Sequence, residues 1–353
     1  MSADHAERFR RLIRAHGPIS VAQFMGESNA LYYASRDPLG RPKAAGGGDF
    51  VTAPEVSQMF GEMIGLWLAD FWTRAGSPDP VAYVELGPGR GTLAQDALRV
   101  MARMRLAPQV HLVEGSPVLR AIQRAALPQA RFHDDPSDLP DAMPLLVVAN
   151  EFFDALPVRQ LVRTAMGWRE RMVGLEGGKL VFVAGDQAMD AALPRHLAEA
   201  EAGTIRETNP AAAAVMRELA ARLAAQGGAA LAIDYGHAAA QTGSTLQAVR
   251  AHAKVDPLAL PGEADLTAHV DFAALGEVAQ AAGARVLGVA EQGAWLKAMG
   301  IELRRATLAQ GSPERAGDLA VALRRLTHAE EMGTLFKVMG FAAPGWPEGA
   351  GFA

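Results

Sequence analysis

The sequence predicts an α/β protein with a doubly wound, mostly parallel sheet and helices on both of its faces. Between residues 80 and 160, short apolar segments alternate with helical patterns, which is typical of βαβ units. The same alternation returns from about residue 211 to the end of the chain. Both stretches are therefore expected to contribute strands to one sheet.

Residues 1–75 are expected to form a helical cap on this core. The helical pattern is interrupted by a glycine-rich break at residues 46–48, and the segment Thr52-Ala53-Pro54-Glu55 then carries helix-start residues before an apolar helix over 56–72. Residues 76–353 are predicted to form the main domain. Inside it, strand patterns split by glycine-containing turns predict an antiparallel insertion at about 158–184.

The remaining elements follow from apolar runs and from helical periodicity. Strands of a mostly parallel sheet are expected at residues 81–86, 110–113, 145–149, 229–233, 285–290 and 335–342. Helices are expected at residues 91–105, 117–126, 211–225, 271–282, 294–308 and 313–328.

Composition narrows the class of protein. Half of the 353 residues are hydrophobic, there is no cysteine, and the formal net charge is −5. Without cysteine, disulfides, thiolate nucleophiles and cysteine-ligated metal sites are excluded, and a cytoplasmic location is expected. Residues 1–16 lack the apolar core of a secretory signal, and no apolar run is long enough for a membrane span. Dispersed basic residues argue against nucleic acid as the main partner.

A glycine-rich loop follows the first predicted strand of the main domain. Glu85 precedes Gly87, Gly89 and Gly91, and glycine there lets a ligand approach the backbone. A dinucleotide loop would place its third glycine one residue later, where Thr92 stands. The acidic residue favours a cationic ligand such as S-adenosylmethionine (SAM), and the pattern resembles motif I of class I SAM-dependent methyltransferases. An ordinary glycine-rich turn and a dinucleotide loop are the alternatives.

Two further acidic positions lie where the next strands end. Glu114 follows the apolar residues 111–113, and a carboxylate at this place can accept hydrogen bonds from both ribose hydroxyls. The segment 132–140 looks like the third-strand segment of the methyltransferases, in which an acidic residue binds the adenine amino group. Asp135 fits that role best and Asp134 is close behind; a simple turn is the alternative.

Polar residues that suit an acceptor follow the strands at 145–149 and 229–233. Asn150, Glu151 and Asp154 can hold a guanidinium, because carboxylates bind it through charge-assisted bonds. Asp234 and His237 are candidates for acceptor binding or for taking a proton. The alternatives are a helix cap at Asn150 and a structural hydrogen-bonding role for the histidine.

These motifs together resemble the MidA-like family over nearly the whole chain. The matching segments are residues 17–20, 32–33, 49–58, 85–91, 150–157, 234–237, 265–267, 270–272 and 332–339. One segment departs from the family pattern: residues 247–252 lack the expected aromatic and glycine content.

The resemblance implies a seven-stranded, Rossmann-like class I methyltransferase core. It implies that Glu85, Gly87, Pro88, Gly89 and Gly91 surround the methionine part of SAM and that Glu114 binds its ribose. The segment that contains Thr52 and Pro54 is expected to close over the site.

The resemblance also implies a reaction and a partner. Mitochondrial members of the family symmetrically dimethylate an arginine of a complex I subunit, the one equivalent to the 49 kDa quinone-site subunit, and assist its assembly. We therefore expect a protein arginine N-methyltransferase with a protein substrate. A non-catalytic assembly factor that binds SAM, and an enzyme with another acceptor, are the alternative interpretations.

Overall fold

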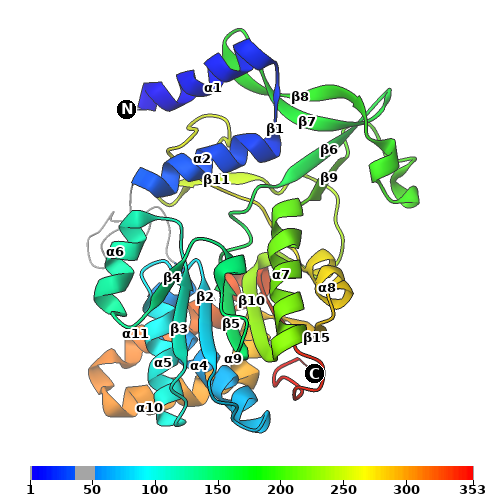
Figure 1. Ribbon diagram of the computed structural model, residues 1–353. Coiled ribbons are helices and arrows are strands. Elements are labelled where there is room, and N and C mark those ends of the chain that lie inside the picture. Colours follow the sequence, from blue (N-terminus) through cyan, green and yellow to red (C-terminus); the bar gives the residue numbers. More distant parts are fainter. Residues whose placement is uncertain (1, 36–51, 353) are drawn as a thin grey trace. The chain divides into compact units, whose positions relative to one another are not determined.

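The computed structural model describes residues 2–35 and 52–352, which form two compact units (Figure 1). In sequence, the smaller unit takes in Met1–Phe50, Asp154–Ala213 and Ala239–His269. The larger unit takes in Val51–Phe153, Ala214–Ala238 and Val270–Ala353. The predicted glycine-rich break at residues 46–48 lies outside the described residues.

The larger unit is built around a sheet in the strand order β15-β16-β10-β5-β2-β3-β4, with β14 paired to β10. The strands from β10 to β4 are parallel, whereas β16 runs antiparallel to both of its neighbours. The strand bounds are β2 Ala82–Leu86, β3 Gln109–Val113, β4 Arg131–His133, β5 Leu145–Asn150, β10 Gly228–His237, β14 Val270–Asp271, β15 Arg285–Glu291 and β16 Phe336–Ala342. The predicted doubly wound, mostly parallel sheet is therefore present.

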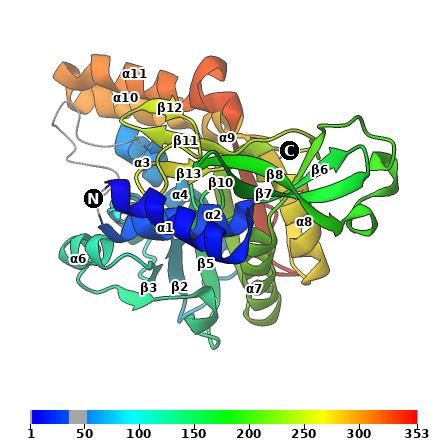
Figure 2. The same cartoon turned by 90° about the horizontal axis from the view of Figure 1, so that it is seen from above.

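Among the helices of the larger unit, α5 to α8 lie between strands along the chain, whereas α9, α10 and α11 follow one another, and α10 and α11 run side by side (Figure 2). Their starts follow local capping rules: Ser116 caps α6 ahead of Pro117, and Asp271 caps α8. The bounds are α3 Ala53–Val56, α4 Gln58–Arg74, α5 Thr92–Arg103, α6 Pro117–Ala126, α7 Pro210–Gln226, α8 Phe272–Ala281, α9 Gln292–Ala298, α10 Ile301–Gly311 and α11 Ala316–Thr327. The first four residues of α7 belong to the smaller unit.

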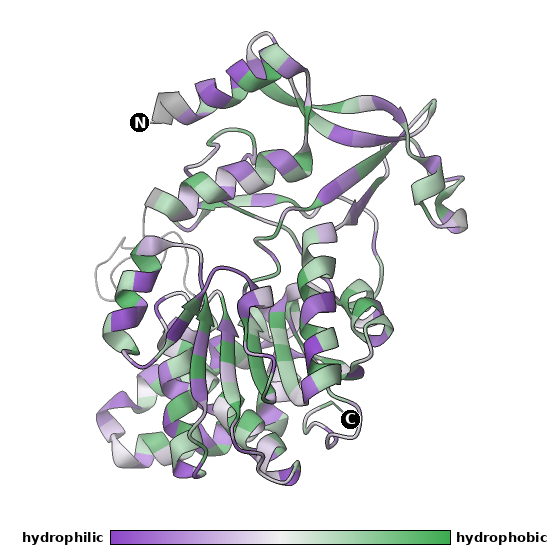
Figure 3. Ribbon diagram, viewed as in Figure 1, coloured by the Kyte–Doolittle hydropathy of each residue, from purple (hydrophilic) through white to green (hydrophobic). Residues whose placement is uncertain are grey.

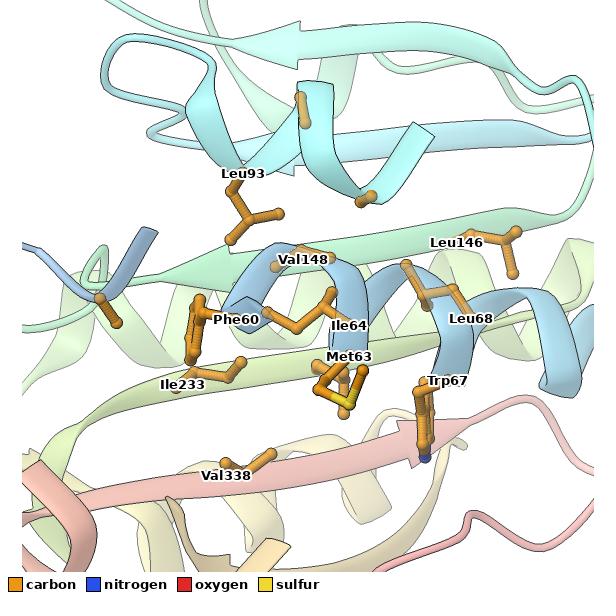
Figure 4. Packing of buried hydrophobic residues seen from close by; sticks show 14 of the residues in the cluster. Phe60, Met63, Ile64, Trp67, Leu68, Leu93, Leu146, Val148, Ile233 and Val338 are labelled. Atoms are coloured by element: carbon orange, nitrogen blue, oxygen red, sulfur yellow. The ribbon is translucent and has the colours of Figure 1, made fainter. Parts of the chain in front are cut away.

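The core of the larger unit lies between α4 and the sheet. Figure 4 shows Phe60 and Met63 of α4 next to Ile233 of β10 and Val338 of β16, and all four belong to one buried cluster. Every residue of β5 is buried, and Figure 3 shows that most of β5 and β10 is hydrophobic. Burial of this apolar strand surface stabilises the sheet by about 25 cal/mol per Å² removed from water.

Among its described residues, the smaller unit combines two helices and the first four residues of α7 with two antiparallel sheets. One sheet has the order β1-β7-β6-β9 with β8 paired to β7, and the other has the order β12-β11-β13. The bounds are α1 Ser2–His16, α2 Val21–Ser35, β1 Ile19–Ser20, β6 Arg159–Thr164, β7 Gly167–Glu176, β8 Lys179–Ala188, β9 Ile205–Thr208, β11 Gln247–Arg250, β12 Ala253–Val255 and β13 Asp265–Thr267.

The structure does not divide the chain at the predicted boundary near residue 75 between an N-terminal cap and a main domain. Ile19 of β1 pairs with Val173 of β7, and Phe9 and Phe24 share a buried cluster with Leu266. The described N-terminal helices therefore pack with the predicted insertion, whereas α4 packs in the larger unit. That residues 1–75 close over the cofactor stays a prediction.

Two expected features differ in detail. The helix expected at 294–308 is two helices, α9 and α10, because Gly300 between them adopts the left-handed conformation (φ 86°). The inserted antiparallel sheet is larger than residues 158–184, since β9 adds a strand beyond that range. Within residues 2–35 and 52–352, no helix combines the length and the hydropathy that a membrane span requires.

Candidate functional site

The glycine loop follows β2 and leads directly into α5. Gly87, Gly89 and Gly91 all have left-handed backbones, with φ of 61°, 55° and 78°. The Gly91 N–H donates to the Pro88 carbonyl (2.7 Å), which closes the turn. A Cβ on Gly87 would lie 3.1 Å from the ring of Phe152. Glycine is therefore favoured here by the backbone itself as well as by any ligand that approaches it.

Glu85 is buried beneath this loop. Its Oε2 accepts a 2.6 Å hydrogen bond from the hydroxyl of Tyr83, a residue that sequence reasoning missed although the two side chains share a face of β2. Burial raises the pKa of Glu85 to about 8, against the lowering effect of the Tyr83 bond. Near neutral pH the carboxyl is therefore mostly protonated until a cation compensates its charge.

Glu114 follows β3 and is joined to the glycine loop by Gln123 of α6. Gln123 Nε2 donates to Glu114 Oε2 (3.1 Å) and to the Gly89 carbonyl (2.7 Å), while the Ser116 N–H donates to Glu114 Oε1 (2.8 Å). Gln123 is fully buried, and among the described residues its Oε1 has no hydrogen-bond partner. This unsatisfied acceptor next to the loop fits a ligand that carries donor groups. Sequence reasoning missed Gln123; the signal for it is a polar residue on the otherwise apolar, buried face of α6.

The two acidic residues after β4 have structural partners. Asp135 is exposed, and its Oδ1 accepts from the Ser137 N–H (2.9 Å), which caps a short 3-10 helix. Hydrogen bonds from the Ser137 side chain and then from its N–H lower the pKa of Asp135. Asp134 Oδ1 accepts from Arg120 (2.6 Å), which also donates to the His133 carbonyl. The turn that was the alternative interpretation is thus present. An adenine contact from Asp135 stays a prediction.

Asn150 and Glu151 lie at the end of β5. Glu151 has a left-handed backbone (φ 49°), an unfavourable conformation for a residue with a side chain and one that is common at functional sites. Its Oε1 accepts from Asn150 Nδ2 (3.2 Å) and from the Ala53 N–H (3.1 Å). Asn150 Oδ1 is buried, and the described part of the chain offers it no partner. The amide oxygen is therefore available to a ligand donor.

The segment with Thr52 and Pro54 is held at both ends. The Ala53 N–H binds Glu151 as above, and the carboxylate of Glu55 accepts a 2.5 Å hydrogen bond from Thr92 Oγ1 in the first turn of α5. Within the larger unit, the segment therefore lies beside both the glycine loop and the end of β5. Its neighbour to the N-terminal side, Asp49-Phe50-Val51, lies outside the described residues.

The end of β10 carries Asp234 and His237. Asp234 is fully buried and accepts from the N–H groups of Phe153 (3.1 Å) and Tyr235 (3.0 Å), so it supports the chain that leaves β5. His237 Nδ1 lies 3.9 Å from Asp271 Oδ1 on the paired strand β14. Asp154, the last of the predicted acceptor residues, is buried in the smaller unit.

Replacing Asp234 by alanine should destabilise the protein by about 2–4 kcal/mol, because the buried Phe153 N–H and the half-buried Tyr235 N–H lose their acceptor. Chemical denaturation measures this change in the free energy of unfolding. Asp271→Ala is the control: Asp271 caps α8 through the Ala274 N–H (3.0 Å), and loss of a cap costs about 1 kcal/mol. Equal effects of the two substitutions would show that the bonds to Phe153 and Tyr235 add little stability.

Comparison with known proteins places the chain in a family. The model of a family described as "Putative S-adenosyl-L-methionine-dependent methyltransferase" matches residues 63–290. A protein arginine methyltransferase NDUFAF7 homolog, mitochondrial, from Drosophila melanogaster is 36% identical, over 95% of this chain and 84% of the relative. The Xenopus tropicalis protein arginine methyltransferase NDUFAF7, mitochondrial, is 38% identical, over 92% of this chain and 82% of the relative.

Two crystal structures of Burkholderia thailandensis proteins are similar throughout. One, bound to S-adenosyl-homocysteine, has a TM-score of 0.86 and 32% identity, and the match covers 99% of this chain and 94% of that protein. The other, a native structure, has a TM-score of 0.84 and 32% identity, with 100% and 95% covered. The predicted class I methyltransferase fold and the SAM cofactor are confirmed.

The predicted cytoplasmic location is contradicted. The curated relatives from fly, frog and human are each named mitochondrial. The absence of cysteine is typical of proteins in reducing compartments, but it does not distinguish the cytosol from another reducing compartment. From its family match, its relatives and its fold, the chain belongs to this family of SAM-dependent methyltransferases, the MidA-like family that its motifs resemble.

Proposed function

We propose that the protein transfers methyl groups from SAM to an arginine side chain of a protein. The observation that carries this proposal is the convergence, at the carboxyl ends of β2, β3 and β5, of the glycine loop, Glu114 and the Asn150–Glu151 pair. Open parallel sheets bind ligands at this edge. The arginine acceptor is supported by the names of relatives that are 36–38% identical.

The cofactor is assigned to the glycine-loop side of this edge. Glu85 and the loop from Gly87 to Gly91 would hold the methionine part, because a buried carboxyl and open backbone suit its ammonium group. Glu114 would accept hydrogen bonds from the ribose hydroxyls, with Gln123 Oε1 as a further acceptor. Asp135 would bind the adenine amino group. The segment with Thr52 and Pro54 would cover the bound cofactor.

The acceptor is assigned to the residues that follow β5. Asn150 Oδ1 and the Glu151 carboxylate would hold the guanidinium and aim one nitrogen at the methyl group. For Asp154, which belongs to the smaller unit, acceptor binding stays a prediction. Bound SAM supplies the methyl group that this nitrogen takes. Holding the two partners in line would provide most of the rate enhancement. His237 or a carboxylate would accept the proton that the nitrogen loses.

We further propose that the acceptor belongs to respiratory complex I and that methylation aids assembly of the complex. The proposed substrate is the subunit equivalent to the 49 kDa quinone-site subunit, and the proposed product is symmetric dimethylarginine. Mass spectrometry of complex I subunits from cells with and without this protein tests the proposal. A dimethylarginine that disappears with the protein is the expected result, and an unchanged set of arginine modifications would contradict it.

The pH dependence of SAM binding tests the role of Glu85. In the free protein the pKa of Glu85 is about 8, so below pH 8 a bound cation must displace a proton from this carboxyl. Affinity should therefore rise from pH 5.5 to pH 7.5, by up to about tenfold per pH unit, and level off above pH 8. Calorimetry measures both the affinity and the proton released.

Glu85→Gln is the matched control, because the amide can still accept from the Tyr83 hydroxyl but cannot lose a proton. Its SAM affinity should vary little over the same pH range. A wild-type affinity that is equally flat would mean that Glu85 does not face the cationic part of the cofactor.

A further inference from the structure

Two residues that the proposed function leaves unused form a hydrogen bond beside the glycine loop. Thr92 is the first residue of α5 and stands where a dinucleotide loop would have its third glycine. Its hydroxyl donates a 2.5 Å hydrogen bond to Oε1 of Glu55 in α3. Glycine could not make this bond. The residue that distinguishes this loop from a dinucleotide loop therefore has a contact of its own.

The short helix α3 connects this bond to the acceptor side of the site. The N–H groups of Glu55 and Val56 donate to the Thr52 carbonyl (3.0 and 3.2 Å), which closes a single helical turn. Ala53, in the same turn, is fully buried and donates its N–H to Glu151 Oε1 (3.1 Å). Because a hydrogen-bonded turn closes a small ring of backbone atoms, Ala53 and Glu55 move together.

Glu151 needs support from its surroundings. Its φ of 49° is unfavourable for a residue with a side chain, and such a conformation persists only where neighbouring groups hold it. Its backbone N–H donates to the Ile233 carbonyl (2.9 Å), and its Oε1 accepts from Asn150 Nδ2 and from the Ala53 N–H. The sheet therefore fixes the main chain of Glu151, whereas the position of its carboxylate depends in part on α3.

We infer that Glu55 and Thr92 are positioning residues for methyl transfer. The bond between them ties α3 to the start of α5, and α3 holds the carboxylate of Glu151, to which the acceptor guanidinium is assigned. All three residues belong to the larger unit. The cofactor loop and the acceptor carboxylate are thereby kept in register, and a misplacement of about 1 Å can cost a hundredfold in rate. The inference rests on the proposed arginine methylation.

Substitutions at Thr92 test the inference. Thr92→Val keeps the shape of the side chain but removes the donor, so kcat should fall about tenfold or more. SAM affinity should change little, because the Gly91 N–H still donates to the Pro88 carbonyl and keeps the loop closed. Thr92→Ser retains a hydroxyl and should rescue kcat. Thr307→Val is the matched control and should keep kcat, because it removes a hydroxyl from an exposed position of α10.

Substitutions at Glu55 distinguish the hydrogen bond from the charge. Glu55→Gln leaves an oxygen that accepts from the Thr92 hydroxyl and should rescue kcat, whereas Glu55→Ala should lower kcat as much as Thr92→Val does. The double variant of Glu55→Ala with Thr92→Val should be no slower than either single variant, because both remove the same bond. In a Glu151→Ala background, Thr92→Val should lower kcat no further, because no carboxylate remains to be positioned.

Hydrogen exchange of the Ala53 amide follows the same connection without any methyl transfer. Exchange reports local opening, so this amide should exchange several-fold faster in Thr92→Val and Glu55→Ala than in wild type and Thr307→Val. Unchanged exchange in Thr92→Val would overturn the inference. An effect of Thr92→Val on kcat that persists undiminished in the Glu151→Ala background would overturn it as well.

The proposed function and the positioning role fail separately. If wild type methylates no arginine while Thr92→Val speeds exchange at Ala53, the proposed function is wrong and the connection from Thr92 to Glu151 stands. If wild type methylates arginine and Thr92→Val keeps its kcat, the positioning role is wrong and the proposed function stands.

Discussion

Glu151→Gln should reduce methyl transfer by about a hundredfold or more and leave SAM affinity nearly unchanged. The amide oxygen can still accept from Asn150 Nδ2 and from the Ala53 N–H, so the local fold is kept. What is lost is the negative charge that holds and orients the guanidinium, and charge-assisted bonds of this kind are the strong ones. Single-turnover assays with labelled SAM, together with calorimetry, separate the two quantities.

Glu277→Gln is the control for the loss of one negative charge, since Glu277 is exposed on α8. It should keep wild-type activity. If the Glu151 variant loses SAM binding and methyl transfer together, the division of the site between cofactor and acceptor is wrong.

The same variant separates an enzyme from a non-catalytic assembly factor. In cells that carry only Glu151→Gln, an enzyme predicts the loss of both the methylated arginine and complex I activity. A complex I that assembles normally without the methyl mark would favour the assembly-factor interpretation.

Gly89→Val should abolish SAM binding, with a loss in affinity of at least about a hundredfold, in a protein that remains folded. The side chain would project from a loop whose backbone is proposed to contact the cofactor, and Gly89 has a φ of 55° that valine adopts with a cost of about 1–2 kcal/mol. Calorimetry with SAM and with S-adenosyl-homocysteine gives the affinity, and chemical denaturation gives the stability.

Gly177→Val is the control for the Gly89 variant, because the same substitution is made at a glycine with nearly the same backbone φ. Gly177 has a φ of 57°, and a Cβ built there meets nothing within 4 Å. It should lose the same stability as the Gly89 variant without any loss of SAM binding. Equal SAM affinity in both variants would show that the glycine loop is merely a structural turn.

The sequence predicted best where local pattern and final structure obey the same rule. Helix α6 has the predicted bounds of 117–126, because Ser116 and Pro117 define its start and an apolar stripe defines its face. The strands β2, β3 and β5 were predicted within a residue or two, since they are apolar runs buried on both faces.

Long-range pairing was the part that the sequence could not supply. β11, β12 and β13 are three or four residues long, too short for periodicity to reveal, and they exist because they pair with one another. The grouping of the N-terminal helices with the residues after Asp154 depends on the pairing of β1 with β7. Contacts between residues so distant in sequence leave no local signal.

The sequence by itself determined the parallel-sheet class, the cofactor and the residues at the strand ends, because glycine spacing and acidic positions are local features with a direct chemical meaning. Only the tertiary structure decided what those residues contact. It buried Glu85 beside Tyr83, joined Glu114 to the glycine loop through Gln123, and turned Asp234 into a support for Phe153. Hydrogen-bond partners and burial, which set the pKa of Glu85, arise only when distant segments pack together.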